Sequence, residues 1–153
     1  MKIRSIVDTT YKQVLVPTLL HSPLLGEDVF FIALLIDTGA THTTILQGNA
    51  LKLGINFSTL RLSHEPVLGV SGHQPVYELD DVTLAFQINS SPSDLVYTKL
   101  EKIHVVKPNK KTIPSTRSVM GMDILHKLHF DFCYPRVNLT CDIRKVKGVS
   151  FIK

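Results

Sequence analysis

Asp37, Thr38 and Gly39 form the segment of this sequence whose residue types could do chemistry. They directly follow an apolar run from Val29 to Ile36, whose length and residue types predict a buried strand. A carboxylate next to a core strand is costly to desolvate. Two carboxylates that share one proton would explain it, because the second resists ionisation beside the first. One could then activate a water while the other protonates the substrate.

The neighbours of Asp37 suit this chemistry. Gly39 has no Cβ, so a substrate can approach closely. The Thr38 hydroxyl can hydrogen-bond to the backbone, and Ala40 is small enough to leave room for a substrate. The alternative is an ordinary tight turn, since Asp, Thr and Gly are common turn residues. Such a tripeptide arises by chance in roughly 3% of chains of this length, so the local segment leaves both interpretations open.

Three segments in order resemble the retropepsin-like aspartic proteases, especially their single-domain cellular and prokaryotic members. The first, Ile36 to Ala40, is similar to the family's catalytic loop. The second, Gly69-Val70-Ser71-Gly72 followed by a predicted strand, looks like the flap hairpin over the active site. The third, Val119 to Leu125, resembles the two hydrophobic residues, glycine and short helix that close the fold. The resemblance runs from about residue 12 to about residue 143.

This resemblance implies an all-β fold, a closed retropepsin-like barrel with one or two short helices, formed by residues 1–153 as a single domain. It also implies a catalytic dyad and a threonine, here Thr38, that hydrogen-bonds across a two-fold axis. The chain has one Asp-Thr-Gly, because Asp8-Thr9-Thr10 lacks the glycine. A complete site therefore requires a homodimer with Asp37 on the axis. No cofactor and no metal are expected.

The resemblance further implies a polypeptide substrate. Ala40 and Thr41 are expected to contact it from the catalytic loop, where Thr41 offers a hydroxyl. The positions of Thr41 and His42 are both often acidic in viral relatives, so these two residues depart from the family pattern, His42 most clearly. Above the substrate, the expected contacts come from the flap residues Gly69, Val70, Ser71 and Gly72. Without the resemblance, this glycine-flanked segment would be an ordinary hairpin turn.

The rest of the chain predicts the elements that must position these residues. Apolar runs and alternation predict strands at 14–16, 29–36, 76–79, 82–86, 103–106 and 137–143. Helical spacing predicts short helices at 47–53, ending before Gly54, and at 122–128. Asp80-Asp81 is predicted to be a solvated turn, and 89–93 a surface loop. Many short strands with few helices favour a barrel.

Composition argues against several other classes. The net charge is +4, but the basic residues are dispersed or clustered without aromatics, so nucleic-acid binding is not expected. The N-terminus lacks a signal-peptide core, and no apolar run could span a bilayer, which predicts a cytoplasmic protein without membrane contact. Cys133 and Cys141 are expected to be free thiols in a reducing compartment, although they could face each other across a hairpin.

The histidines outside the Asp37 segment are expected to be surface residues rather than metal ligands, and Asp123 is expected to be structural. His126 and His129 lie three apart on a predicted helix, but no glutamate lies between them and no third ligand is evident. Asp123 suits the start of a helix, where a carboxylate interacts favourably with the helix dipole.

The sequence therefore predicts an aspartic endopeptidase. The alternative is a non-catalytic retropepsin-like module for dimerisation or peptide binding, with a metal-dependent hydrolase as a more remote possibility.

Overall fold

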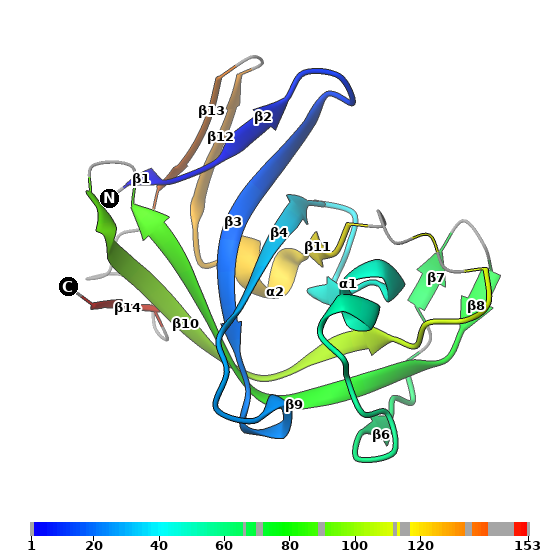
Figure 1. Cartoon of the computed structure of the whole chain (residues 1–153). Helices are drawn as coiled ribbons and strands as arrows, with labels where there is room; N and C mark the ends of the chain where they lie inside the picture. Colours follow the sequence, from blue (N-terminus) through cyan, green and yellow to red (C-terminus); the bar gives the residue numbers. More distant parts are fainter. Residues whose placement is uncertain are drawn as a thin grey trace.

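Figure 1 shows a computed structural model of the chain, which describes residues 2–65, 67–69, 72–88, 91–111, 113, 117–133, 136–140 and 149–152. Six strands form a closed ring in the order β3, β4, β11, β5, β10, β9, and β9 pairs back onto β3. Their bounds are β3 Gln13–His21, β4 Phe30–Ile36, β5 Thr44–Ile45, β9 Val76–Ile88, β10 Ser91–Val106 and β11 Val119–Met120. The predicted closed barrel is confirmed.

The remaining elements extend or flank this ring. β1 pairs with β9 and β13, β2 with β3, β6 with β9, and β14 with β10, while β7 and β8 form a separate two-stranded sheet. Both ends of the chain lie on the same side of the barrel, near β1 and β14 (Figure 1). The bounds are β1 Lys2–Ile3, β2 Ile6–Asp8, β6 Arg61–Leu62, β7 Val67–Gly69, β8 Gly72–Gln74, β12 His129–Cys133, β13 Arg136–Thr140 and β14 Val149–Ile152.

The helices are short, as the sequence predicts. They comprise α1 Gln47–Lys52, α2 Met122–Leu125 and a 3₁₀ turn η1 Pro23–Leu25. After α1, Gly54 adopts a left-handed φ of 62°, which glycine adopts without steric cost. The helix predicted at 122–128 is shorter than expected, because it ends at Leu125. Among the described residues, no helix is long and apolar enough to cross a membrane.

The core fills the barrel through period-two alternation. Along the second half of β9, the side chains of Val82, Leu84, Phe86 and Ile88 are buried, and those between them are more exposed. This is the pattern of a strand with one face toward the core. β4 departs from its prediction as a fully buried run, because Phe31 is 68% exposed. Its alternating burial shows that the barrel covers only one of its faces.

β9 corrects another prediction. Two strands were expected with a solvated turn at Asp80-Asp81, but β9 runs through both residues as one element. The ladder to β10 continues across this point, with Val82 opposite Leu100 and Asp80 opposite Lys102. Asp81 has a φ of 51°, which aspartate tolerates better than most residues. Pairing with β10 therefore overrides the local turn signal.

Two boundaries also shift. The loop predicted at 89–93 is partly strand, since Ser91 to Ser93 belong to β10, whereas residues 89 and 90 lie outside the described residues. The strand predicted at 137–143 corresponds to β13, which ends at Thr140, and residues 141–148 are not described. Cys141 is among those positions, so the thiol prediction is not tested.

Candidate active site

Asp37 lies directly after the last residue of β4 and is half-buried. Its backbone N–H donates to the carbonyl of Met120 on β11, at 3.1 Å. Its own carbonyl accepts the N–H of Ala40 at 3.2 Å, which closes a turn over Thr38 and Gly39. The side-chain Oδ1 accepts the N–H of Gly39 at 2.9 Å. The turn therefore orients the carboxylate as well as the backbone.

Gly39 leaves little space for a side chain beside the Asp37 carboxylate. A Cβ at this position would lie 3.3 Å from Asp37 Oδ1, closer than nearly all real Cβ contacts. A larger residue would therefore push on the carboxylate that the turn orients. The sequence interpretation assigned Gly39 a role in close approach, and its closest neighbour is Asp37 itself.

The loop from 37 to 43 is built around β11. β11 lies between β4, to which it is parallel, and β5, to which it is antiparallel, although β4 and β5 are consecutive strands of the chain. The loop joining them must therefore pass the end of β11, as Figure 1 shows. The Leu35 N–H donates to the Ser118 carbonyl at 2.8 Å and extends the pairing upstream. A segment about eighty residues later in the chain thus anchors the Asp37 loop.

Asp123 secures the far end of this loop. Its carboxylate accepts the Thr43 N–H, at 2.9 Å to Oδ1 and 3.0 Å to Oδ2, and the Thr43 hydroxyl at 2.8 Å. The same hydroxyl oxygen accepts the N–H of Gly121 at 3.1 Å. The sequence interpretation placed Asp123 at a helix start, where it does lie, but missed Thr43 as its partner. The sequence features that could have indicated this contact are Thr43-Thr44 at the end of the loop and Asp123 shortly after Gly121.

Gly121 allows α2 to approach the loop. A Cβ there would lie 2.5 Å from the carbonyl carbon of His42 and 2.8 Å from the Thr43 nitrogen, so only glycine fits. Next to it, the Met122 N–H donates to the Ala40 carbonyl at 2.8 Å. The Asp123 N–H donates to the Thr41 carbonyl at 3.2 Å. The predicted substrate contacts Ala40 and Thr41 therefore lie on a backbone that α2 supports.

A cavity of about 470 Å³ opens beside Asp37. Asp37 supplies the one carboxylate among the described residues that line it. Thr38 also lines it, its side chain is exposed, and its hydroxyl makes no hydrogen bond to another described residue. The other lining residues come from the start of β3 and the end of β4: Lys12, Gln13, Val14, Leu35 and Ile36.

Arg117 supports the wall of this cavity formed by the β2–β3 hairpin. Its guanidinium donates to Asp8 Oδ2 at 2.8 Å and to Gln13 Oε1 at 2.8 Å, and it lies 5.7 Å from the centre of the Tyr11 ring. The hydrogen bond from Arg117 is the main reason that the pKa of Asp8 lies below its ordinary value. The sequence interpretation did not identify this contact, because Arg117 and Asp8 are 109 positions apart.

The predicted flap segment forms a hairpin. β7 and β8 are antiparallel, and Gly69 lies opposite Gly72 in the ladder. Val70 and Ser71, predicted to contact the substrate at its tip, lie outside the described residues. The structure thus brings Ala40 and Thr41 together with the Asp37 turn, and confirms the hairpin. Contact of any of these residues with a substrate stays a prediction.

Two histidines meet beside the loop. The rings of His42 and His104 have centres 4.8 Å apart and are tilted by 57°. His104 is 2% exposed, and neither of its ring nitrogens has a hydrogen-bond partner within the part of the chain that the structure describes. Burial, followed by the charge of His42, lowers the pKa of His104 below its ordinary value. His104 is thus an apolar-like core residue on β10.

The histidine pair considered for a metal is not arranged as predicted. His126 follows the last residue of α2, with Nδ1 2.5 Å from the Met122 carbonyl, whereas His129 begins β12. They therefore do not share a helix face. No group of three or more His, Cys, Asp or Glu residues that could bind a metal occurs within the described ranges.

Comparison with known proteins identifies the fold. The sequence matches no protein-family model, and no curated protein matches it. Among solved structures, it is similar to a retropepsin-like aspartic protease from Rickettsia conorii, with 17% identity and a TM-score of 0.55 over 89% of this chain and 96% of that one. EIAV protease complexed with the inhibitor HBY-793 matches with 14% identity and a TM-score of 0.47, over 79% and 92% of the two chains.

Proposed function

We propose that this chain, which has the retropepsin-like fold, is an aspartic endopeptidase that cleaves extended or unfolded polypeptides as a homodimer. The observation that carries the proposal is the placement of Asp37. It follows a barrel strand, its carboxylate is oriented by the Gly39 N–H, and it lines an open cavity. A carboxylate that only closed a turn would not need an adjacent cavity and an anchor from a distant strand.

Two subunits are needed to complete such a site. Asp37 is the one carboxylate among the described residues lining the cavity, and the sequence contains one Asp-Thr-Gly. A two-fold axis beside Asp37 would place two copies of the same carboxylate together. The Thr38 hydroxyl, which has no partner among the described residues, would then face the partner subunit. Activity should therefore depend on protein concentration.

The proposed reaction uses the Asp37 pair with one shared proton. The ionised carboxylate removes a proton from a water, and the water oxygen bonds to the scissile carbonyl carbon. The protonated carboxyl group gives its proton to the carbonyl oxygen. The resulting diol then loses a proton back to the pair, the C–N bond breaks, and the amine leaves with a proton from the pair. This chemistry requires no metal or cofactor.

The β7–β8 hairpin is the proposed flap. An extended peptide could pair its backbone with such a hairpin, and the side chains of the Asp37 loop could then select among sequences. Ala40 and Thr41 are the proposed substrate contacts below, and Gly69 to Gly72 are those above.

The test is cleavage of casein across pH 3–8 by the wild type and by Asp37→Asn. Asp81→Asn is the matched control, because Asp81 is exposed and asparagine tolerates its positive φ equally well. We expect cleavage by the wild type and the control, and a loss of at least about a thousandfold in Asp37→Asn. Equal cleavage by all three proteins would contradict the proposal.

If none of the three proteins cleaves casein although sedimentation finds a dimer, the result would contradict catalysis and favour the binding-module alternative. That alternative has its own signature. A fluorescent unfolded peptide would bind wild type and Asp37→Asn with the same affinity, and neither protein would cleave it.

A further inference from the structure

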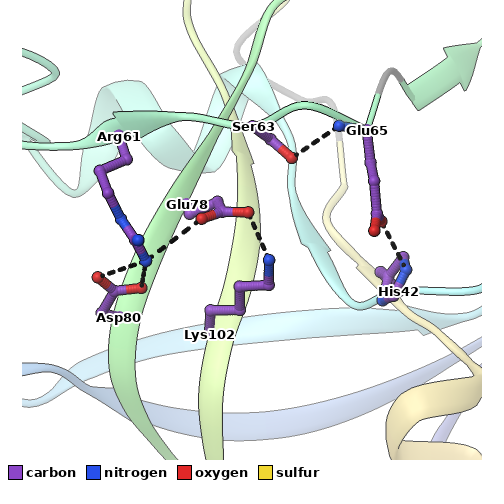
Figure 2. Close-up of polar contacts among 7 residues, drawn as sticks. All are labelled: His42, Arg61, Ser63, Glu65, Glu78, Asp80 and Lys102. Atoms are coloured by element: carbon purple, nitrogen blue, oxygen red, sulfur yellow. Dashed lines mark hydrogen bonds and ion pairs between the residues drawn. The ribbon is translucent and has the colours of Figure 1, made fainter.

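The β7–β8 hairpin makes a polar contact with the barrel at each of its two ends. We call residues 61–65, which lead into β7, the first leg, and the end of β8 at Gln74 the second leg. On the first leg, Glu65 precedes β7, and its Oε2 lies 3.1 Å from Nε2 of His42 (Figure 2). On the second leg, Gln74 ends β8, and its Oε1 accepts a hydrogen bond of 2.6 Å from Gln47 on α1. Because the hairpin is a sheet separate from the barrel, such contacts decide how closely it approaches.

The His42 side of the first contact is rigid. The residues on either side of His42 are bonded to Asp123, Thr41 through its carbonyl and Thr43 through its N–H and hydroxyl. The His42 carbonyl is also packed against Gly121, with no room for a methyl group between them. The loop therefore cannot follow the hairpin if the hairpin moves away. Contact with His42 consequently positions the hairpin relative to Asp37.

The lower part of the first leg is also anchored, by a group of four charges (Figure 2). Arg61 on β6 lies 3.1 Å from Asp80 and 3.4 Å from Glu78, and Lys102 lies 2.5 Å from the other oxygen of Glu78. Above this group, the Ser63 N–H donates to the Val76 carbonyl at 2.7 Å.

Ser63 also directs the next part of the leg. The Ser63 hydroxyl oxygen accepts the Glu65 N–H at 3.2 Å. The backbone of Glu65, two residues before β7 begins, is therefore held through Ser63, which is itself bonded to Val76.

The charges around His42 make this contact sensitive to pH. The His42 ring contacts two titratable groups, the Glu65 carboxylate and the buried His104 ring. Farther away, Glu78 and Lys102 pair with each other, and the Asp123 carboxylate is occupied by Thr43. A histidine changes charge between pH 5 and 8. Because burial keeps the pKa of His104 below 6.5, His104 does not add a second positive charge in the upper part of that range.

We infer that His42 is a positioning residue that acts through Glu65. Its protonated ring holds the first leg of the β7–β8 hairpin against the loop that carries Asp37, and it does so more firmly at pH 5.5 than at pH 8. For its effect on cleavage, this inference rests on the proposed function. The effect on the hairpin itself needs no catalysis and is measured separately.

The first test is amide hydrogen exchange of β7 and β8 in the full chain at pH 5.5 and pH 8, with each variant compared to wild type at the same pH. Both side chains are partly exposed, at 43% and 62%, so the effect should be that of an exposed ion pair. We expect His42→Gln and Glu65→Gln to speed exchange about two- to fivefold at pH 5.5 and very little at pH 8. His42→Lys, a permanent cation, should protect the hairpin at both values.

The matched control is His64→Gln, which removes an exposed imidazole next to Glu65 and should change nothing. Exchange that is unchanged in both His42→Gln and Glu65→Gln would overturn the inference. An equal increase at both pH values that His42→Lys does not reverse would also overturn it, because that pattern indicates general loosening.

The second test is peptide cleavage by the same variants, expressed as the ratio of variant to wild type at each pH. This ratio removes the titration of the Asp37 pair. We expect KM to rise about two- to fivefold in His42→Gln at pH 5.5, with kcat little changed, and to recover in His42→Lys. If the wild type does not cleave but the exchange effect is present, the proposed function fails and the His42 inference stands. If cleavage is normal and neither KM nor exchange responds, the reverse holds.

Discussion

The carboxylate of Asp123 accepts both the backbone N–H and the hydroxyl of Thr43, which lies 80 positions earlier in the chain. This pair closes the loop that begins at Asp37. It also joins α2 to the residue that precedes β5, so one contact links the candidate catalytic turn to the barrel. Thr43 is fully buried. Loss of the Asp123 carboxylate would therefore leave the N–H and hydroxyl donors of Thr43 without this acceptor.

We therefore expect Asp123→Ala to lower the free energy of unfolding by about 2–4 kcal/mol, because buried donors lose a charged acceptor. Urea denaturation at fixed protein concentration measures this loss. Thr43→Val and the double variant complete a cycle. If the two single losses simply add, the hydrogen bonds contribute no coupling energy and the expectation is wrong.

Substitution of the two glycines near the loop should have opposite signatures. Gly121→Ala places a methyl group against the His42 backbone and should destabilise the fold by about 2–3 kcal/mol or prevent folding. Gly39→Ala meets only the Asp37 carboxylate, so the fold should persist while cleavage falls. Thermal melts and casein cleavage separate the two effects. A stable, fully active Gly39→Ala would remove the proposed link between Gly39 and Asp37.

Removal of His104 should make the free energy of unfolding depend less on pH below pH 6.5. Because burial lowers the pKa of His104 from 6.5 in the folded state, the unfolded chain binds a proton that the folded chain does not. Stability from this group is complete above pH 6.5 and is lost as the pH falls below it. We expect His104→Leu to lose less stability than wild type between pH 7.5 and 5.5, as measured by urea midpoints. His64→Gln, an exposed site, should behave as wild type.

Asp8 should stabilise the folded state at neutral pH and lose this effect at low pH. Its pKa lies below 3.8, chiefly through the hydrogen bond from Arg117, so its contribution is present at neutral pH and is lost as the pH falls through the folded-state pKa. We expect Asp8→Asn to lower Tm slightly at pH 7, by about 1–3 °C, and progressively less as the pH is lowered below 3.8. Asp28→Asn is the exposed control. A constant Tm difference down to the lowest pH would indicate a cause other than charge.

The proposed dimer makes Thr38 testable without an enzyme assay. If its hydroxyl bonds across the two-fold axis, Thr38→Ala should raise the dimer dissociation constant about tenfold, the effect of one or two buried hydrogen bonds. Sedimentation velocity over a concentration series measures the constant. Thr83→Ala on β9 removes the same hydroxyl elsewhere and should leave it unchanged. A monomeric wild type at all concentrations would contradict the shared site.

Local patterns were sufficient for much of the fold. The alternation of Val82, Leu84 and Phe86 predicts a half-buried strand, because successive side chains of a strand point to opposite faces. Gly69 and Gly72 predict a hairpin from their spacing alone, and β7 and β8 form it. Local patterns failed at Asp80-Asp81, where a turn signal gave way to a ladder with residues some twenty positions away.

The sequence by itself determined the strands of the barrel and the position of Asp37 at the end of a core strand, because both follow from residue types within a few positions, whereas closure of the barrel was expected from the family resemblance. Only the tertiary structure decided which groups support that position: Asp123 with Thr43, Arg117 with Asp8, and Glu65 with His42. The physical reason is separation along the chain. These partners lie 23 to 109 positions apart, and a side chain carries no local mark of the distant group that folding brings to within 3.1 Å of it.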